Sequence, residues 1–193
     1  TLFINAVKQA VKSGKDVSLS DDVINTLHEL VTNTKGDLAL TAELLKLPTF
    51  DALAAEFEII PVDEIVQTIV RFEQQIAQQL YQPLLDCYNS LIDDGAISPF
   101  SVAIRALKGQ CLHYLAKAGT NDAADCLVVA ANSSNMTNVL ASLSAAVKAQ
   151  HPLCDELLAK FDSQWRHDVL VMDKWFALQA MQSKNGAIEQ IKH

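Results

Sequence analysis

Helical periodicity runs through nearly every window of this sequence, and it limits the possible fold more than any other feature. Apolar residues recur three and four positions apart, as at Val23, Leu27 and Val31, and no window shows the sustained alternation typical of a β-strand. The sequence therefore predicts an all-α protein without a sheet. We expect an irregular, superhelical stack of antiparallel helical hairpins, because each hairpin can bury its apolar face on its neighbours.

Capping residues and prolines divide the chain into helices. Ser20, Thr49 and Ser98 are expected N-caps, and Pro83 lies inside a long periodic stretch, which predicts a kink or break near Gln79. The expected helices cover residues 2–13, 20–31, 37–47, 49–57, 61–91, 98–119, 121–131, 136–147, 152–165 and 168–181. The last of them is apolar almost all round, which predicts that other elements cover it on several sides.

Length and charge narrow the class of protein further. A chain of 193 residues is expected to form one domain with a substantial core, here a single all-helical domain over residues 1–193. Its 15 Lys+Arg against 23 Asp+Glu argue against a nucleic-acid partner, which needs a basic face. The uncharged run 126–147 has a polar centre at residues 132–135, so we interpret it as two helices around a turn, not a membrane span.

The four cysteines are too few and too widely spaced for a disulfide scaffold. All of them fall in apolar helical contexts, and no CxxC pair occurs; they are Cys87, Cys111, Cys126 and Cys154. Buried, reduced thiols in a cytoplasmic protein are the expected outcome.

The sequence contains no spacing of histidines and cysteines that is typical of a metal site. His28-Glu29 begins like the zinc-binding HExxH motif, but Thr32 stands where the second histidine is needed, and one imidazole does not hold zinc. The pairs His151/Cys154 and Cys111/His113 are short spacings that occur by chance, and His113 lies off the apolar stripe of its helix, toward solvent. The prediction is that this chain holds no metal.

No catalytic residue is predicted either. GxSxG, SxxK and a glycine-rich phosphate loop are all missing from the sequence. Asp21-Asp22 are explained by a helix start and Asp93-Asp94 by a turn before Gly95. Met172, Trp175 and Phe176 share helical spacing with Leu178 and are interpreted as core residues. The residues that would touch a substrate are unknown from the sequence.

Several segments, in order, resemble one known family. They are residues 42–48 (AELLKLP), 57–60 (FEII), 135–147 (NMTNVLASLSAAV), Trp165 and residues 170–180 (LVMDKWFALQA). The chain is similar, over roughly residues 38–181, to bacterial aminopeptidase N, the alanyl aminopeptidases among the thermolysin-like zinc metallopeptidases. It departs from the family pattern at Asn138, where an aspartate is expected, at Ser134, where an asparagine is expected, and at Pro61, which directly follows Ile60.

The resemblance implies a role for a longer protein. In that family an all-helical C-terminal domain packs over a catalytic domain, where zinc and a glutamate base remove N-terminal residues from peptides. This chain would be a fragment of that domain, truncated at both ends, inactive alone and without a cofactor of its own. It would close and shape the substrate cavity, with the parent's catalytic domain and peptide substrates as partners. Apolar faces exposed by truncation also predict a non-native dimer.

Two other hypotheses about the function stay open on the sequence alone. The first is a free-standing helical-repeat scaffold that binds a partner protein along its concave face. The second is a small metal-binding or redox protein that uses the cysteine and histidine set. The sequence does not give a side-chain preference for the substrate, the residues facing the cavity or the packing partner of each helix.

Overall fold

A computed structural model describes residues 2–13, 18–33 and 35–180 of the chain. These residues form helices joined by short loops and contain no strand, which confirms the all-α prediction. In chain order the helices are α1 (Leu2–Ser13), α2 (Asp21–Thr32), α3 (Leu38–Leu44), α4 (Phe50–Ala54), α5 (Val62–Gln79), α6 (Tyr81–Ser90), α7 (Pro99–Ala118), α8 (Asn121–Ala131), α9 (Met136–Ala149), α10 (Cys154–Trp165) and α11 (Val169–Ala180).

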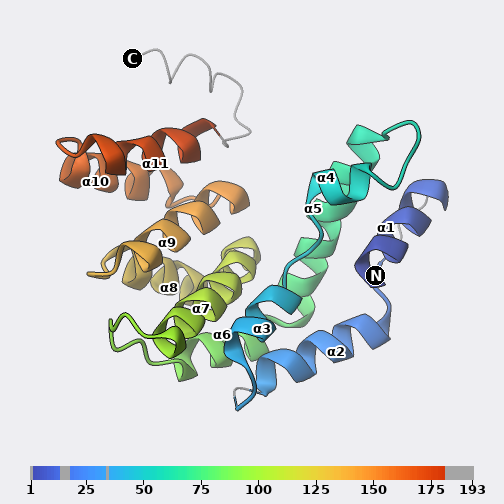
Figure 1. The fold of residues 1–193 in the computed structure, drawn as a ribbon, viewed down its shortest axis with the longest axis horizontal. Coiled ribbons are helices and arrows are strands. Elements are labelled where there is room, and N and C mark those ends of the chain that lie inside the picture. The colour runs from blue at the N-terminus through green and yellow to red at the C-terminus, as the bar shows by residue number, and fades with distance from the viewer. Residues whose placement is uncertain (1, 14–17, 34, 181–193) are drawn as a thin grey trace.

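The helices are stacked in a curved row (Figure 1). The α1–α2 end and the α10–α11 end lie at opposite sides of the molecule, and α7 lies between them. Helix α7 packs against α3, α5, α6, α8 and α9, so it is the central element of the domain. An arrangement of this kind leaves an inner surface on which several helices meet.

Local chemistry explains most helix boundaries. The Ser98 hydroxyl accepts a hydrogen bond from the Ser101 N–H at 3.0 Å, Pro99 is the first residue of α7, and Gly119 ends it in the left-handed region with φ +65°. The expected break near Gln79 is confirmed, because α5 ends there and Leu80 separates it from α6. Pro83 therefore lies in the first turn of α6, where its missing N–H does no harm.

One expected N-cap and two expected helix ends differ in detail from the structure. Ser20 occupies the N-cap position of α2, but its side chain makes no capping hydrogen bond. Helix α3 covers Leu38–Leu44 and α4 covers Phe50–Ala54, so both are shorter than predicted. Asp37 and Thr49 do cap these two helices through their side chains. Apolar periodicity continues past both helices because the following turns contribute the buried Leu45 and the half-buried Phe57.

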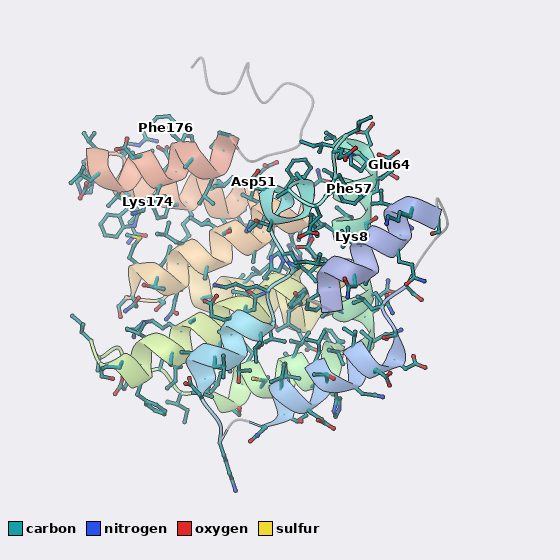
Figure 2. The ribbon with its side chains drawn as sticks, turned by 45° about the vertical axis from the view of Figure 1, so that its right-hand side comes forward. Lys8, Asp51, Phe57, Glu64, Lys174 and Phe176 are labelled. Atoms are coloured by element: carbon teal, nitrogen blue, oxygen red, sulfur yellow. The ribbon has the colours of Figure 1, made fainter. Side chains whose placement is uncertain are left out.

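The prediction for the last helix is wrong in part. Helix α11 buries Met172 and Leu178, yet Val169 and Leu170 are about three-quarters exposed. Phe176 is half exposed and lies on the outer side of α11 (Figure 2). Phe100, in the first turn of α7, is also mostly exposed. An apolar composition shows that a surface favours burial, but not that an element within residues 1–193 provides the cover.

The most enclosed helix is α7, although it carries four basic side chains. Arg105 pairs with an aspartate, Lys108 donates to two backbone carbonyls, and His113 and Lys117 both contact Glu73. Each of these polar groups therefore has an internal partner, which is the condition for burying it without a large cost. The basic side chains of α7 therefore do not form a stripe that faces solvent. Each points toward a partner on a neighbouring element.

Candidate functional site

A groove lies on the inner surface where the middle helices meet. It has a volume of about 530 Å³, which is within the usual range for ligand sites in proteins. Its lining comes from the segment between α3 and α4 (Lys46, Leu47, Pro48, Thr49), from the start of α4 (Phe50), from α5 (Ile69, Glu73), from α7 (Arg105, Ala106, Gly109, Gln110, His113, Tyr114) and from α9 (Thr137, Ala141, Ser144, Ala145, Lys148). A second hollow of about 430 Å³ shares Glu73 and Lys148 with it and extends the groove toward Gln150.

The groove wall formed by residues 46–50 is fastened to α7 by a buried tyrosine. The Tyr114 hydroxyl donates a hydrogen bond of 2.5 Å to the Leu45 carbonyl oxygen, and Tyr114 is almost completely buried. Burial raises the pKa of Tyr114 well above its usual value, so this hydroxyl keeps its proton. The contact joins residues 69 positions apart and fixes the wall relative to the floor.

The floor of the groove depends on the close approach of α7 and α9. Gly109 faces Ala141, and a Cβ placed on Gly109 would lie 3.4 Å from the Ala141 Cβ. Ser144 and Ala145 continue the row of small side chains on α9. Small residues at a helix crossing let the two backbones come close, and the side chains beside them leave the open space of the groove.

A partly buried ionic cluster lies where the groove meets the second hollow. One Glu73 carboxylate oxygen is 2.9 Å from His113 Nε2, and the other is 2.9 Å from Lys117 Nζ. Burial pushes the pKa of Glu73 upward, but the hydrogen bond and charge of His113 and the charge of Lys117 outweigh it, so the pKa lies below its usual range. The prediction that His113 points to solvent is therefore wrong, because Glu73 on α5 supplies an inward partner.

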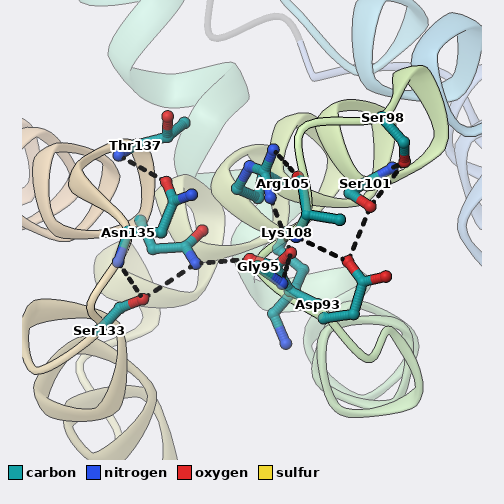
Figure 3. A network of polar contacts seen from close by, with 12 residues as sticks. Asp93, Gly95, Ser98, Ser101, Arg105, Lys108, Ser133, Asn135 and Thr137 are labelled. Atoms are coloured by element: carbon teal, nitrogen blue, oxygen red, sulfur yellow. Dashed lines mark hydrogen bonds and ion pairs between the residues drawn. The ribbon is translucent and has the colours of Figure 1, made fainter.

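A second polar network, which includes Arg105 and Thr137 of the groove lining, lies where the loop before α7 meets the turn before α9 (Figure 3). Arg105 Nη1 is 2.8 Å from Asp93 Oδ1, and both side chains are about nine-tenths or more buried. Arg105 Nη2 also donates to the Ala96 carbonyl at 3.0 Å. The Asn138 amide donates to Asp93 Oδ2 at 2.9 Å and to Ser133 Oγ at 3.2 Å. Asp93 therefore joins α7, α9 and the loop between α6 and α7.

Asp93 is held in its charged form. Burial raises its pKa, but hydrogen bonds from Asn138 and the Gly95 N–H, together with the charge and hydrogen bond of Arg105, bring the pKa below its usual value. The sequence interpretation of Asp93 as a turn residue was incomplete, since it missed the partner 12 residues away. The amide of Asn138 also gives a physical reason for its departure from the aspartate of the family pattern, because a second carboxylate would face Asp93 here.

The four cysteines are buried, as predicted, and no disulfide joins any of them within the described residues. Cys87 and Cys111 lie near Lys108, whose ammonium group is 4.2 Å from the Tyr88 ring centroid. Burial lowers the pKa of Lys108 and raises the pKa of Tyr88 to about 12. Two carbonyl oxygens, from Tyr88 and Leu91, hold the ammonium group in place.

The residues considered as metal ligands do not come together. His28 and Glu29 lie exposed on α2, and the Thr32 hydroxyl donates to the His28 carbonyl. His151 Nδ1 accepts a hydrogen bond from the Leu153 N–H at 3.2 Å. Across residues 2–13, 18–33 and 35–180, no group of three or more His, Cys, Asp or Glu side chains is placed to hold a metal ion.

The described helices also do not meet the requirements for a membrane span. None of them combines sufficient length with a sufficiently apolar composition to cross a bilayer.

The curved stack and its inner groove define the class of the protein as an all-helical repeat domain. A family model described as "Domain of unknown function (DUF3458_C) ARM repeats" matches residues 1–193. Because the match extends over the whole chain, the chain belongs to the DUF3458_C family of ARM-repeat domains.

Individual relatives carry the name expected from the sequence motifs. Aminopeptidase N of Escherichia coli is 35% identical over 184 residues, which cover 94% of this chain and 21% of that protein. Aminopeptidase N of Haemophilus influenzae is 33% identical over 199 residues, which cover 99% of this chain and 22% of that protein. The resemblance to aminopeptidase N is thus confirmed, and the chain spans about a fifth of the length of these relatives.

The fold is also found in a solved structure. A crystal structure of Legionella pneumophila aminopeptidase A in complex with aspartic acid matches 98% of this chain with a TM-score of 0.81, using 24% of its own length. At 20% sequence identity this match shows the fold alone.

Proposed function

We propose that this chain is part of the C-terminal helical domain of a cytoplasmic zinc metallo-aminopeptidase. In this proposal the domain closes and shapes the cavity in which N-terminal residues are removed from peptides. The observation that carries the proposal is the extent of the matches, which take in nearly all of this chain and about a fifth of each aminopeptidase N. The catalytic machinery is then expected in the remaining four-fifths of the polypeptide.

The side chains that line the groove support a role in shaping the substrate cavity. In this proposal the catalytic domain of the parent holds zinc, which would polarise the scissile carbonyl and activate water there. The groove offers hydroxyl and amide groups, from Thr137, Ser144 and Gln110, that suit hydrogen bonding to a peptide backbone. Residues 1–193 alone are expected to be inactive.

A groove-filling substitution tests this role in the complete polypeptide. Ser144→Trp places a large ring in the groove, so kcat/KM for long peptides is expected to fall at least about fivefold, about 1 kcal/mol of transition-state binding. Hydrolysis of alanine p-nitroanilide should change much less, because that substrate has no residues beyond the scissile bond to reach the groove.

Ser163→Trp is the matched control, since Ser163 lies exposed on α10, outside the groove lining. It should leave both activities unchanged. Equal effects of Ser144→Trp on long and short substrates, or no effect on either, would contradict the assignment of the groove to the substrate cavity.

A further inference from the structure

Helix α5 has an apolar surface that is wider than the part buried in the core. Ile65, Phe72 and Ile76 are completely buried and form its inner face. Val62, Val66 and Val70 are spaced four residues apart, so they share an adjacent face, and they are 51%, 47% and 43% exposed. The helix therefore presents a second apolar face that stays about half exposed among the described residues, and Val70 on this face also lines the second hollow.

The same face is covered farther along the helix. Glu73 follows Val70 by three residues and Ala77 follows it by seven, which place both on this face. Glu73 contacts His113 and Lys117 of α7, and Ala77 is 1% exposed. One continuous helix face is thus packed against α7 in its second half and bare in its first half. Ile59 and Ile60, just before α5, extend the bare part and are 89% and 50% exposed.

A bare apolar surface of this kind is typical of an interaction site. We propose that the valine face of α5, defined as Val62, Val66 and Val70 with Ile59, docks against the remaining part of its own parent polypeptide. This inference rests on the proposed function, because it requires the longer chain seen in the relatives. Its new content is the surface through which the helical domain is held.

Two observations favour an occupant from the same polypeptide over a second copy of the domain. The relatives are about five times as long as this chain, so the missing part would be tethered to it at a high effective concentration. The chain also carries a net charge of −8, which makes two copies repel each other. Docking within one polypeptide avoids the repulsion between two copies. It also avoids most of the free-energy cost of the translational freedom that two separate molecules lose when they associate.

Thiol labelling of the complete polypeptide tests the proposal. The four cysteines of this domain are buried, so a cysteine introduced at an exposed position is expected to react much faster than they do. V66C places a thiol on the valine face, and Q67C places one on the next residue, which is exposed on a different side of α5. Each variant is exposed to a maleimide, and the labelled peptide is quantified by mass spectrometry under native conditions and in guanidinium chloride.

The proposal predicts that native V66C is labelled at least about tenfold more slowly than native Q67C, with equal rates after denaturation. Equal native rates would overturn it, and so would equal protection of both positions, because that burial is not specific to the valine face. The same preparations are assayed for chelator-sensitive hydrolysis of alanine p-nitroanilide. Active enzyme with rapid labelling of V66C refutes the docking surface alone, whereas an inactive, zinc-free polypeptide refutes the proposed function itself.

Discussion

Replacing Arg105 with methionine is expected to lower the free energy of unfolding by about 3–5 kcal/mol at neutral pH. Methionine keeps most of the length of the side chain but removes the guanidinium group that contacts Asp93 and the Ala96 carbonyl. Asp93 would remain buried with a charge and without its cationic partner. The loss is large because an unpaired buried charge costs far more than a missing surface contact.

Urea unfolding followed by circular dichroism measures the effect of Arg105→Met, and Arg166→Met is the matched control. Arg166 forms an exposed i,i+4 pair with Asp162, so its loss should cost about 0.5 kcal/mol or less. The pKa of Asp93 in the folded protein lies below its usual value. The Asp93–Arg105 pair therefore stabilises the fold at pH values above the pKa of Asp93 in the unfolded chain, and this stabilisation is lost as the pH falls through the folded pKa. The difference between Arg105→Met and the wild type should therefore shrink below about pH 4. Equal losses for the two variants would contradict this account of the network.

The second large effect is expected at Tyr114. Tyr114→Ala removes one of the largest fully buried side chains and leaves the Leu45 carbonyl without its donor, so the free energy of unfolding should fall by about 4 kcal/mol or more. Tyr114→Phe keeps the ring and removes the hydroxyl, so it should cost about 1–3 kcal/mol. Calorimetric unfolding of both variants separates the packing of the ring from the hydrogen bond. A neutral Tyr114→Phe would show that the hydroxyl does not fasten the groove wall.

Where a single residue sets a boundary, the sequence predicted the structure well. Ser98, Pro99 and Gly119 each act within one turn of chain, so the limits of α7 could be predicted without knowledge of its neighbours. The same holds for the break near Gln79, which follows from the covalent geometry of Pro83. The family motifs gave the correct resemblance because short runs such as residues 172–176 are specific in order and spacing.

The groove and its two polar networks could not be predicted in the same way. Glu73 and His113 are 40 residues apart, and Asp93 and Asn138 are 45 apart, so their contacts depend on how α5, α7 and α9 pack. Periodicity assigned His113 to solvent because it gives the side of a helix but not the partner on that side. The exposed faces of α5 and α11 show the opposite case. Apolar periodicity predicts burial there, but the described part of the chain leaves these residues exposed.

The central claim is that this domain shapes a site whose metal and catalytic groups lie elsewhere in the polypeptide. Metal analysis and hydrolysis of alanine p-nitroanilide, measured on the complete polypeptide and on residues 1–193, test it most directly. The account predicts about one zinc per complete polypeptide, activity that is abolished by 1,10-phenanthroline and restored by zinc, and neither zinc nor turnover for residues 1–193. Stoichiometric zinc or zinc-dependent turnover in residues 1–193 alone would contradict it.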